Sequence, residues 1–274
     1  MKKVITTFLG SAVTMLASLP ALAGNTLQPG NLIIGSDLTY PPYNFIKNNQ
    51  PAGFDAEFMQ LIGNDMHLKP KVKDTRFASL IMGLKSQKFD VIASTLYVTP
   101  ERAQQVDFIP YMKTGGSLMV KQGSTWQPKK PEDLCGKKVG SIKGGAWIPK
   151  LQKVSADYCQ VKGLGAIDVK EFPSSPETTQ ALLSGAIDVQ YEDAAVAKAT
   201  VEKTGNRLVI SSDSVLYPVV VGLAVNKNNT ALRDQLQKAF DDVVKNGEYT
   251  TLLKKYNVQM PDAGEIHKAL AGTL

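Results

Sequence analysis

The chain has 274 residues, of which 31 are lysine or arginine and 25 are aspartate or glutamate, so its net charge at neutral pH is +6. The basic residues are scattered and never form a run longer than two, which excludes the concentrated basic patch that nucleic-acid binding needs. Beyond the first 23 residues, no segment is long and apolar enough to cross a bilayer. We therefore expect a soluble mature protein with no nucleic-acid partner.

The first 23 residues are predicted to be a secretory signal peptide. Lys2 and Lys3 form a basic start, an apolar run extends from Val4 to Leu16, and Ala21-Leu22-Ala23 has the small-residue pattern of a cleavage site. A membrane anchor, the alternative, needs about 20 apolar residues. We expect cleavage after Ala23, which leaves 251 residues with a net charge of +4. The expected location is the periplasm of a two-membraned bacterium.

The first half of the mature chain alternates β-branched runs with segments whose apolar residues recur at helical spacing. This alternation is typical of strand–helix–strand units, which build a largely parallel sheet with helices on both faces. The expected elements, in chain order, are a strand at 32–37, a helix at 54–66, a strand at 71–75, a helix at 77–87 and a strand at 90–94.

The second half repeats this order, which predicts two lobes built on one plan and not one continuous sheet. Residues 181–193 resemble residues 83–95, because each stretch has a helix ending near a leucine and then a strand that opens with Asp-Val. Short apolar strands at 114–124 and 218–225 are expected to cross between the lobes as a hinge, and a helix follows the second of them. The first lobe would then comprise residues 24–113 and 220–274, and the second lobe residues 114–219.

The cysteines and histidines predict a disulfide and no metal site. Cys135 and Cys159 are the only cysteines, and an even pair in an oxidising compartment favours a disulfide. Loop closure by this bond would contribute about 3 kcal/mol. Neither cysteine has a nearby histidine or a Cys-x-x-Cys partner, and His67 and His267 lie far apart. We therefore expect no metal and no cofactor.

A cation at Arg102 is out of place in its local sequence. Thr99 followed by Pro100 predicts a helix start, with a hydroxyl N-cap and a proline at the first helical position. Arg102 then falls in the first turn, where the helix dipole disfavours a cation by about 0.3–1 kcal/mol. A bound anion would explain this placement. The alternative is a surface ion pair of Arg102 with Glu101 or Asp107.

Other polar and aromatic residues follow the predicted strands, at the sheet edge where ligands of open α/β sheets bind. A zwitterionic amino acid would use them all, since its carboxylate suits a guanidinium, its ammonium suits a carboxylate and its side chain suits aromatic walls. Asp193 could instead only cap the next helix, and Asp37 could only shape its turn. The candidates at the strand ends, besides Arg102, are Asp37, Tyr40, Phe77, Ser94, Thr95 and Asp193.

Nearly the whole mature chain resembles the polar amino-acid family of periplasmic solute-binding proteins, the receptors of ABC importers. This resemblance implies the type II periplasmic-binding-protein fold, an α/β fold of two lobes, each a mostly parallel sheet flanked by helices, joined by two hinge strands. The segments that carry the resemblance are TYPPYNF (39–45), GFDAEFMQLI (53–62), the Ser-Thr-x-x-x-Thr-x-x-Arg run from Ser94, DVQYED (188–193) and NGEYTTLLKKYN (246–257).

The resemblance also implies roles at the two poles of an amino-acid ligand. Arg102 would hold the α-carboxylate, with the backbone of Thr95 and Tyr97 and the hydroxyl of Ser94 or Thr95 assisting. Asp193 would hold the α-ammonium.

The resemblance implies contacts to the ligand side chain as well, and the chain departs from the family at two points. Tyr40 and Phe77 would flank the side chain, with Asp37 at the far end of the site. Relatives place hydroxyl residues where this chain has Gly145 and Ala146, and Trp147 follows as a possible extra wall. Tyr97 is bulkier than its counterparts.

The implied function is reception of a free L-amino acid, which closes the two lobes and is passed to the membrane permease of an ABC importer. The receptor itself would be a monomer. A basic ligand (lysine, arginine, ornithine or histidine) would suit Asp37 with its aromatic neighbours, and a neutral polar ligand such as glutamine or cystine is the alternative. A rival from another class is an exported cyclohexadienyl dehydratase on the same fold, for which Glu192 is the candidate general acid.

Overall fold

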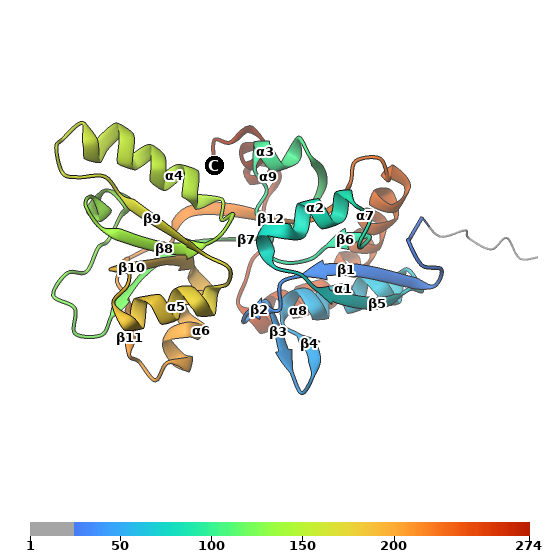
Figure 1. Ribbon diagram of the computed structural model, residues 1–274. Coiled ribbons are helices and arrows are strands. Elements are labelled where there is room, and N and C mark those ends of the chain that lie inside the picture. The colour runs from blue at the N-terminus through green and yellow to red at the C-terminus, as the bar shows by residue number, and fades with distance from the viewer. Residues whose placement is uncertain (1–24) are drawn as a thin grey trace, which may run out of the picture.

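The computed structural model describes residues 25–274, and the predicted signal peptide lies outside the described residues. Two groups of helices and strands lie side by side, joined by β7 (Val106–Lys121) and β12 (Leu216–Asn226) (Figure 1). These two strands pair with each other antiparallel along most of their length. The chain therefore has the two-lobed α/β arrangement that the sequence predicts, although the exact residue bounds of each lobe stay a prediction.

One group of elements comes from the first third of the chain and from its C-terminal end. In its sheet, β1 pairs in parallel with β5 on one side and β6 on the other. The strands of this group are β1 (Asn31–Ser36), β5 (Lys69–Asp74) and β6 (Val91–Ile92), with β2 (Thr39–Tyr40), β3 (Asn44–Lys47) and β4 (Gln50–Ala52) in a separate three-stranded sheet. Its helices are α1 (Phe54–Asp65), the 3₁₀ helix η1 (Phe77–Ser79), α2 (Leu80–Lys85), α3 (Pro100–Ala103), α7 (Thr230–Lys245), α8 (Glu248–Tyr256) and α9 (Ala263–Ala271).

The other group lies between the two hinge strands in the sequence. In its sheet, β8 pairs in parallel with β9 and β10. Its strands are β8 (Lys138–Ile142), β9 (Asp168–Phe172), β10 (Val189–Asp193) and β11 (Leu208–Ile210). Its helical segments are η2 (Pro131–Leu134), α4 (Trp147–Val154), the π-helical turn η3 (Ser155–Gln160), α5 (Ser175–Ser184) and α6 (Ala194–Lys203).

Strand pairing runs through both lobes, where the sequence predicts a separate sheet for each. The order is β5-β1-β6-β12-β7-β10-β8-β9, with β11 also on β7. The reason is the length of the two hinge strands, 16 residues for β7 and 11 for β12. Strands this long pair with β6 at one end and with β10 and β11 at the other. The hinge is therefore a hydrogen-bonded part of the sheet, and it begins earlier than the 114–124 segment suggests.

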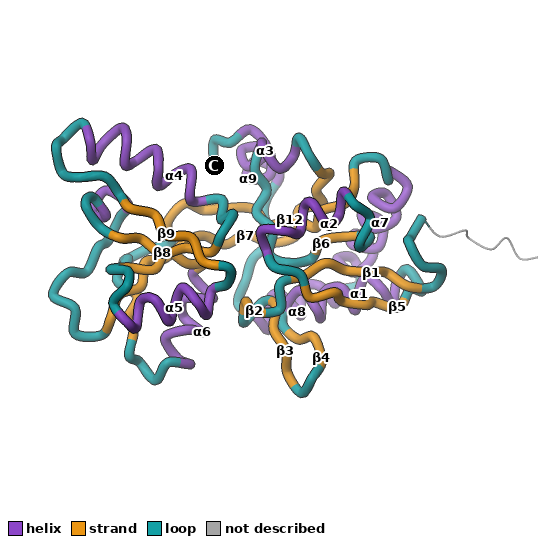
Figure 2. The backbone as a smooth tube through the Cα atoms, viewed as in Figure 1, coloured by secondary structure: helices purple, strands orange, loops and turns teal. Residues whose placement is uncertain are grey.

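Helices lie above and below the strands in both lobes (Figure 2). In the first lobe, the apolar face of α1 packs on the sheet because Phe54, Phe58 and Ile62 recur at helical spacing and are fully buried. Phe58 contacts the rings of Tyr111 on β7 and Tyr249 on α8, at centroid distances of 5.0 and 5.1 Å. In the described part of the chain, none of the helices combines the length and apolar character that a membrane span requires.

The predicted disulfide is present: Cys135, directly after η2, is bonded to Cys159 in η3 at a Cα separation of 5.3 Å. We expect the double variant Cys135→Ser/Cys159→Ser to lose about 3 kcal/mol of unfolding free energy, because the unfolded chain regains the freedom of the closed loop. Urea unfolding with and without reductant measures this loss. A reductant effect that is equally large in the double variant would contradict the assignment to this bond.

Candidate functional site

A small cavity lies between the lobes, and we call it the first chamber. Its volume is about 20 Å³, which is room for one water-sized group. Nine of the ten predicted ligand-binding residues line it, and Asp193 does not. The residues that line the first chamber are Asp37, Tyr40, Phe77, Ser94, Thr95, Tyr97, Arg102, Ile142, Gly145, Ala146 and Trp147.

Arg102 stands at the start of α3, as its sequence predicts. Pro100 opens the helix, and the Thr99 hydroxyl accepts a hydrogen bond from the Arg102 backbone N–H at 3.3 Å. The side chain turns inward and is only 9% exposed. Nη1 donates to the carbonyl of Tyr97 at 2.8 Å, and Nη2 donates across the cleft to the carbonyl of Gly144 at 3.0 Å.

The guanidinium of Arg102 is buried and has no carboxylate of the described residues in direct contact. Within residues 25–274, no carboxylate oxygen lies within 4.0 Å of it. Asp107 pairs instead with Lys227 and Arg233, and Glu101 acts on Arg102 through its charge without a direct ion pair. Burial lowers the pKa of Arg102 to about 10, which leaves the group charged at neutral pH. The Phe77 ring, 5.4 Å away, is its one aromatic partner among the residues described.

Asp193 ends β10 and performs two tasks with its two oxygens. Oδ1 caps α6 by accepting hydrogen bonds from the backbone N–H groups of Ala195 and Val196, as the helix-cap interpretation of Asp193 predicts. Oδ2 accepts from the hydroxyl of Tyr97 at 2.7 Å and from that of Thr114 at 2.9 Å. Burial raises the pKa of Asp193, and these hydrogen bonds oppose part of that effect. The carboxylate therefore sits directly behind Tyr97, one side chain away from the first chamber.

Thr95 and Ser94 line the first chamber with backbone and hydroxyl groups, which hydrogen bonds to other residues hold in place. Thr95 has a left-handed backbone, φ 48°, which is uncommon outside glycine. The carboxylate of Asp55 accepts from the Thr95 backbone N–H at 2.7 Å and from its hydroxyl at 3.1 Å. Sequence reasoning missed Asp55, although it lies in the GFDAEF segment as a buried acid in an apolar helix. The Ser94 hydroxyl accepts from the backbone N–H of Asp37 at 2.9 Å.

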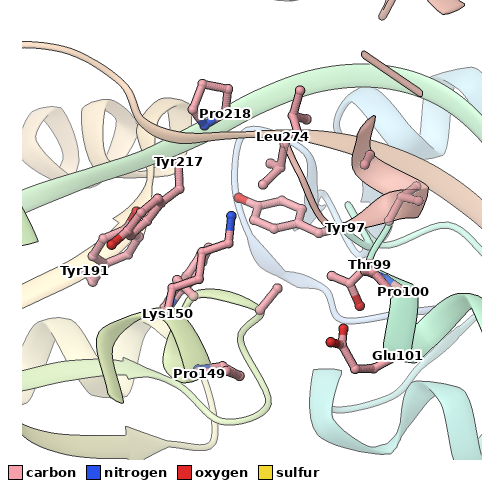
Figure 3. A pocket seen from close by; sticks show the side chains of 16 residues that line it. Tyr97, Thr99, Pro100, Glu101, Pro149, Lys150, Tyr191, Tyr217, Pro218 and Leu274 are labelled. Carbon is pink, nitrogen blue, oxygen red and sulfur yellow. The ribbon is translucent and has the colours of Figure 1, made fainter. Parts of the chain in front are cut away.

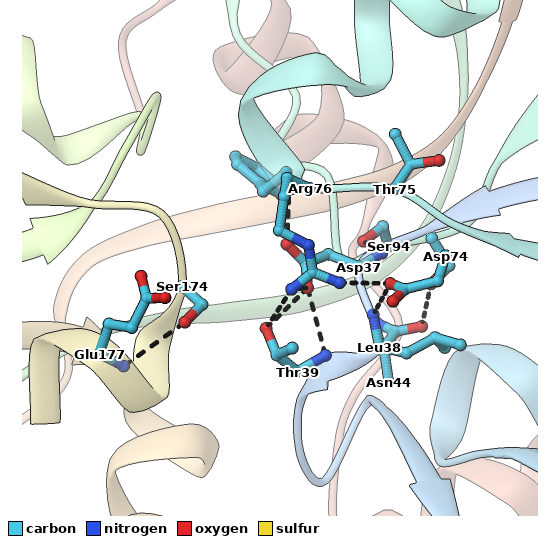
Figure 4. Close-up of polar contacts among 12 residues, drawn as sticks. Asp37, Leu38, Thr39, Asn44, Asp74, Thr75, Arg76, Ser94, Ser174 and Glu177 are labelled. Atoms are coloured by element: carbon cyan, nitrogen blue, oxygen red, sulfur yellow. Dashed lines mark hydrogen bonds and ion pairs between the residues drawn. The ribbon is translucent and has the colours of Figure 1, made fainter. Parts of the chain in front are cut away.

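Asp37 braces its own loop, and its carboxylate is already paired (Figure 4). It forms an ion pair with Arg76 at 3.0 Å and accepts from the hydroxyl of Thr39 at 2.6 Å. It also accepts from the backbone N–H of Phe77 at 2.8 Å. The turn-forming interpretation of Asp37 therefore describes its contacts, and the charge at this end of the chamber is balanced by the chain itself.

Trp147 directly follows Gly145 and Ala146, the two positions where relatives are expected to carry hydroxyl residues. Trp147 is the first residue of α4, and its Nε1 donates to the hydroxyl of Ser141. The centroids of the Trp147 and Tyr97 rings lie 5.5 Å apart in an edge-to-face arrangement. Gly145 makes room for it, since a Cβ at that position would lie 2.9 Å from Trp147 Nε1. Trp147 and Tyr97 together form an aromatic wall on one side of the chamber.

Glu192 is fully buried and does not line the first chamber. It accepts hydrogen bonds from the hydroxyl of Tyr40 at 2.6 Å and from the backbone N–H of Asp193 at 3.0 Å. The Ser175 hydroxyl and the Gln190 amide donate to its other oxygen. Burial raises the pKa of Glu192. These contacts place Glu192 in a polar network that fastens the aromatic loop to the second lobe.

Comparison with known proteins supports one family. The model of the bacterial extracellular solute-binding proteins, family 3, matches residues 32–259. The L-cystine-binding protein TcyJ of Escherichia coli strain K12 is 28% identical over 237 residues, 86% of this chain and 85% of its own. The similarity therefore extends over most of both chains.

Two solved structures show the same fold. An ancestral arginine-binding protein bound to arginine is 33% identical and superposes with a TM-score of 0.76 over 83% of this chain and 98% of its own. The ancestral amino acid-binding protein AncCDT-1, a precursor of cyclohexadienyl dehydratase, is 27% identical, with a TM-score of 0.68 over 83% and 95% of the two chains. The chain belongs to family 3 of the bacterial extracellular solute-binding proteins.

Proposed function

We propose that this protein is a periplasmic receptor that binds a free L-amino acid between its lobes and delivers it to the permease of an ABC importer. The observation that carries the proposal is the buried guanidinium of Arg102 at the wall of the first chamber, which has no carboxylate of the described chain in direct contact. Two of its five N–H groups are used by carbonyls, which leaves donors for a carboxylate of the ligand.

Binding requires the lobes to separate and close again. A cavity of about 20 Å³ is too small for an amino acid, and its walls come from both lobes. Closure is held by hydrogen bonds between segments far apart in the chain: Tyr97 to Asp193, Arg102 to Gly144 and Tyr40 to Glu192. A ligand that contacts both lobes adds to these bonds only in the closed form and so shifts the population toward it.

The balanced charge of Asp37 favours a polar, uncharged ligand side chain over a basic one. The Arg76 guanidinium already neutralises this carboxylate, and its oxygens are shared among several donors. A basic side chain would have to displace Arg76, which a neutral amide, hydroxyl or sulfur group does not. The dehydratase alternative gains no support, because Glu192 lies outside the first chamber and faces four donors.

Calorimetry on protein stripped of ligand by unfolding and refolding, titrated with each of the twenty L-amino acids, tests the proposal. We expect saturable heat with at least one polar amino acid. Heat with none of the twenty, nor with a two-ended amino acid such as L-cystine, would overturn the receptor proposal, and turnover of prephenate or arogenate would support the dehydratase instead.

The Asp193→Asn variant is expected to weaken amino-acid binding by about tenfold or more, because the ammonium loses a charge-assisted hydrogen bond. Asparagine keeps the helix cap and the size of the side chain. We expect the ammonium to replace the Tyr97 hydroxyl at Oδ2 in the wild type.

Calorimetry with the best amino acid and with its deaminated analogue measures this effect. The analogue, which lacks the ammonium, should bind both proteins equally. Asp168→Asn, at an exposed position of β9, is the matched control. Equal losses for the two compounds in Asp193→Asn would contradict an ammonium contact.

A further inference from the structure

A second and larger cavity adjoins the first chamber, and we call it the second chamber (Figure 3). Its volume is about 160 Å³, and it shares three lining residues with the first chamber: Tyr97, Ala146 and Trp147. The remaining walls come from the start of α3, from α4, from β10 and β12, and from α9 and the C-terminal residues that follow it. The aromatic wall of Tyr97 and Trp147 is therefore a partition between two neighbouring spaces.

The second chamber contains an amine that the chain does not balance. Lys150 on α4 is half-buried, and burial lowers its pKa. Its Nζ lies 4.9 Å from the centre of the Tyr217 ring, and no carboxylate of the described residues lies within 4.0 Å of it. A half-buried amine against an aromatic ring, without an anion, resembles the situation of Arg102 beside Phe77 in the first chamber.

A tyrosine that lines the same chamber has a buried hydroxyl without a partner in the described chain. Tyr191 on β10 is fully buried, and among the described residues its hydroxyl is the one buried side-chain polar atom with no hydrogen bond. A buried donor without an acceptor is rare in folded proteins. Its ring packs against Trp147 at 5.1 Å and against Tyr217 at 6.3 Å. Tyr217 has a left-handed backbone, φ 45°, which is uncommon for a bulky residue, and strained backbone of this kind clusters at functional sites.

A carboxylate completes the set of charges. Glu101 lines the second chamber from α3, on the side opposite to Lys150 (Figure 3). The second chamber thus has a cation, an anion and aromatic walls, the same kinds of group that the first chamber offers through Arg102 and the nearby Asp193. An α-amino-acid group has the complementary pair of charges.

We propose that the second chamber binds the far end of an extended ligand that carries an α-amino-acid group at each end. Lys150 and the Tyr191 hydroxyl would hold the second carboxylate, and Glu101 would face the second ammonium. The ligand would pass between Tyr97 and Trp147, because an ammonium at Asp193 displaces the Tyr97 hydroxyl and so opens the partition. This inference rests on the proposed function, since the near end of the ligand occupies the first chamber.

Calorimetry with a two-ended ligand and its truncated analogue tests the proposal. L-Cystathionine carries an amino-acid group at both ends, and S-propyl-L-cysteine has the same chain with a methyl group at the far end. We expect L-cystathionine to bind the wild type about tenfold more tightly than S-propyl-L-cysteine. L-Lanthionine, which has one chain atom fewer between its two amino-acid groups, tests the length that the two chambers accept.

The variant Lys150→Met distinguishes the contribution of the second chamber to binding from that of the first chamber. It should lower the affinity for L-cystathionine about tenfold and leave that for S-propyl-L-cysteine unchanged. Tyr191→Phe, which removes only the hydroxyl, should produce a smaller loss with the same selectivity. Lys153→Met is the matched control, because Lys153 is exposed on the same helix and pairs with Asp157.

The outcomes distinguish this inference from the proposed function. If short amino acids bind but neither two-ended compound binds more tightly, or if Lys150→Met changes both affinities alike, the second chamber is not a ligand site and the receptor proposal stands. If no amino acid of either kind binds, both proposals are overturned.

Discussion

Replacing Arg102 with alanine is expected to raise the dissociation constant for the amino-acid ligand by about 100-fold or more. Truncating one partner of a buried, hydrogen-bonded charge pair costs about 2–5 kcal/mol, and each 1.4 kcal/mol is a factor of ten. Arg102 is 9% exposed, and no carboxylate of the described chain contacts it directly, so the carboxylate of the ligand would be its direct ionic partner. Calorimetric titration of wild type and variant measures the change.

The control for this variant is Arg233→Ala, which removes a half-exposed arginine that pairs with Asp107 far from the first chamber. It should bind the ligand as the wild type does. Arg102→Lys keeps the charge but loses the planar pair of donors, and we expect an intermediate affinity. An Arg102→Ala variant that unfolds at the wild-type temperature and retains full affinity would refute the carboxylate role.

Features that depend on residues adjacent in the sequence could be predicted from the sequence. The helix start at Thr99 and Pro100 is confirmed because an N-cap and a proline act on the turn that contains them. The strands and helices that precede it in the chain also lie within a few residues of their expected ranges. The placement of Arg102 inside the protein followed from the same stretch, because its position conflicts with the helix dipole.

Partners that lie far apart in the sequence could not be predicted in this way. Asp37 has the same local pattern whether it faces a ligand or an arginine of its own chain, and only the fold brings Arg76 to it. Tyr97 and Asp193 are 96 residues apart, so their hydrogen bond has no local signature. The second chamber was missed for the same reason, since Lys150 and Tyr217 come from different segments that meet only in the folded chain.

The lengths of the hinge strands also could not be predicted from local sequence patterns. The first glycines of the 114–124 segment suggested a new strand, but β7 begins at Val106 and runs through them without a break. Its continuation depends on pairing with β12 on one side and β10 on the other. Because both hinge strands are hydrogen-bonded along their length, opening of the lobes must bend or twist these strands without separating them.

Replacing Asp55 with alanine is expected to lower the unfolding free energy by about 3–5 kcal/mol, the largest stability effect that we predict. The Asp55 carboxylate is 1% exposed and accepts hydrogen bonds from the amide of Asn44, from the hydroxyl of Tyr111 and from two groups of Thr95. Each buried donor left without an acceptor costs about 1–3 kcal/mol. Urea unfolding followed by circular dichroism measures the loss, with Asp65→Ala at the exposed end of the same helix as control.

The same variant should also weaken binding, because Asp55 holds the left-handed backbone of Thr95 at the wall of the first chamber. Without that acceptor, Thr95 is free to relax to an ordinary conformation, and its backbone N–H and hydroxyl leave their positions beside Ser94 and Arg102. Asp55→Asn, which retains one acceptor oxygen, should lie between wild type and alanine in both properties. A stable Asp55→Ala variant with reduced affinity would assign Asp55 to positioning alone, and a variant unchanged in both would refute its role.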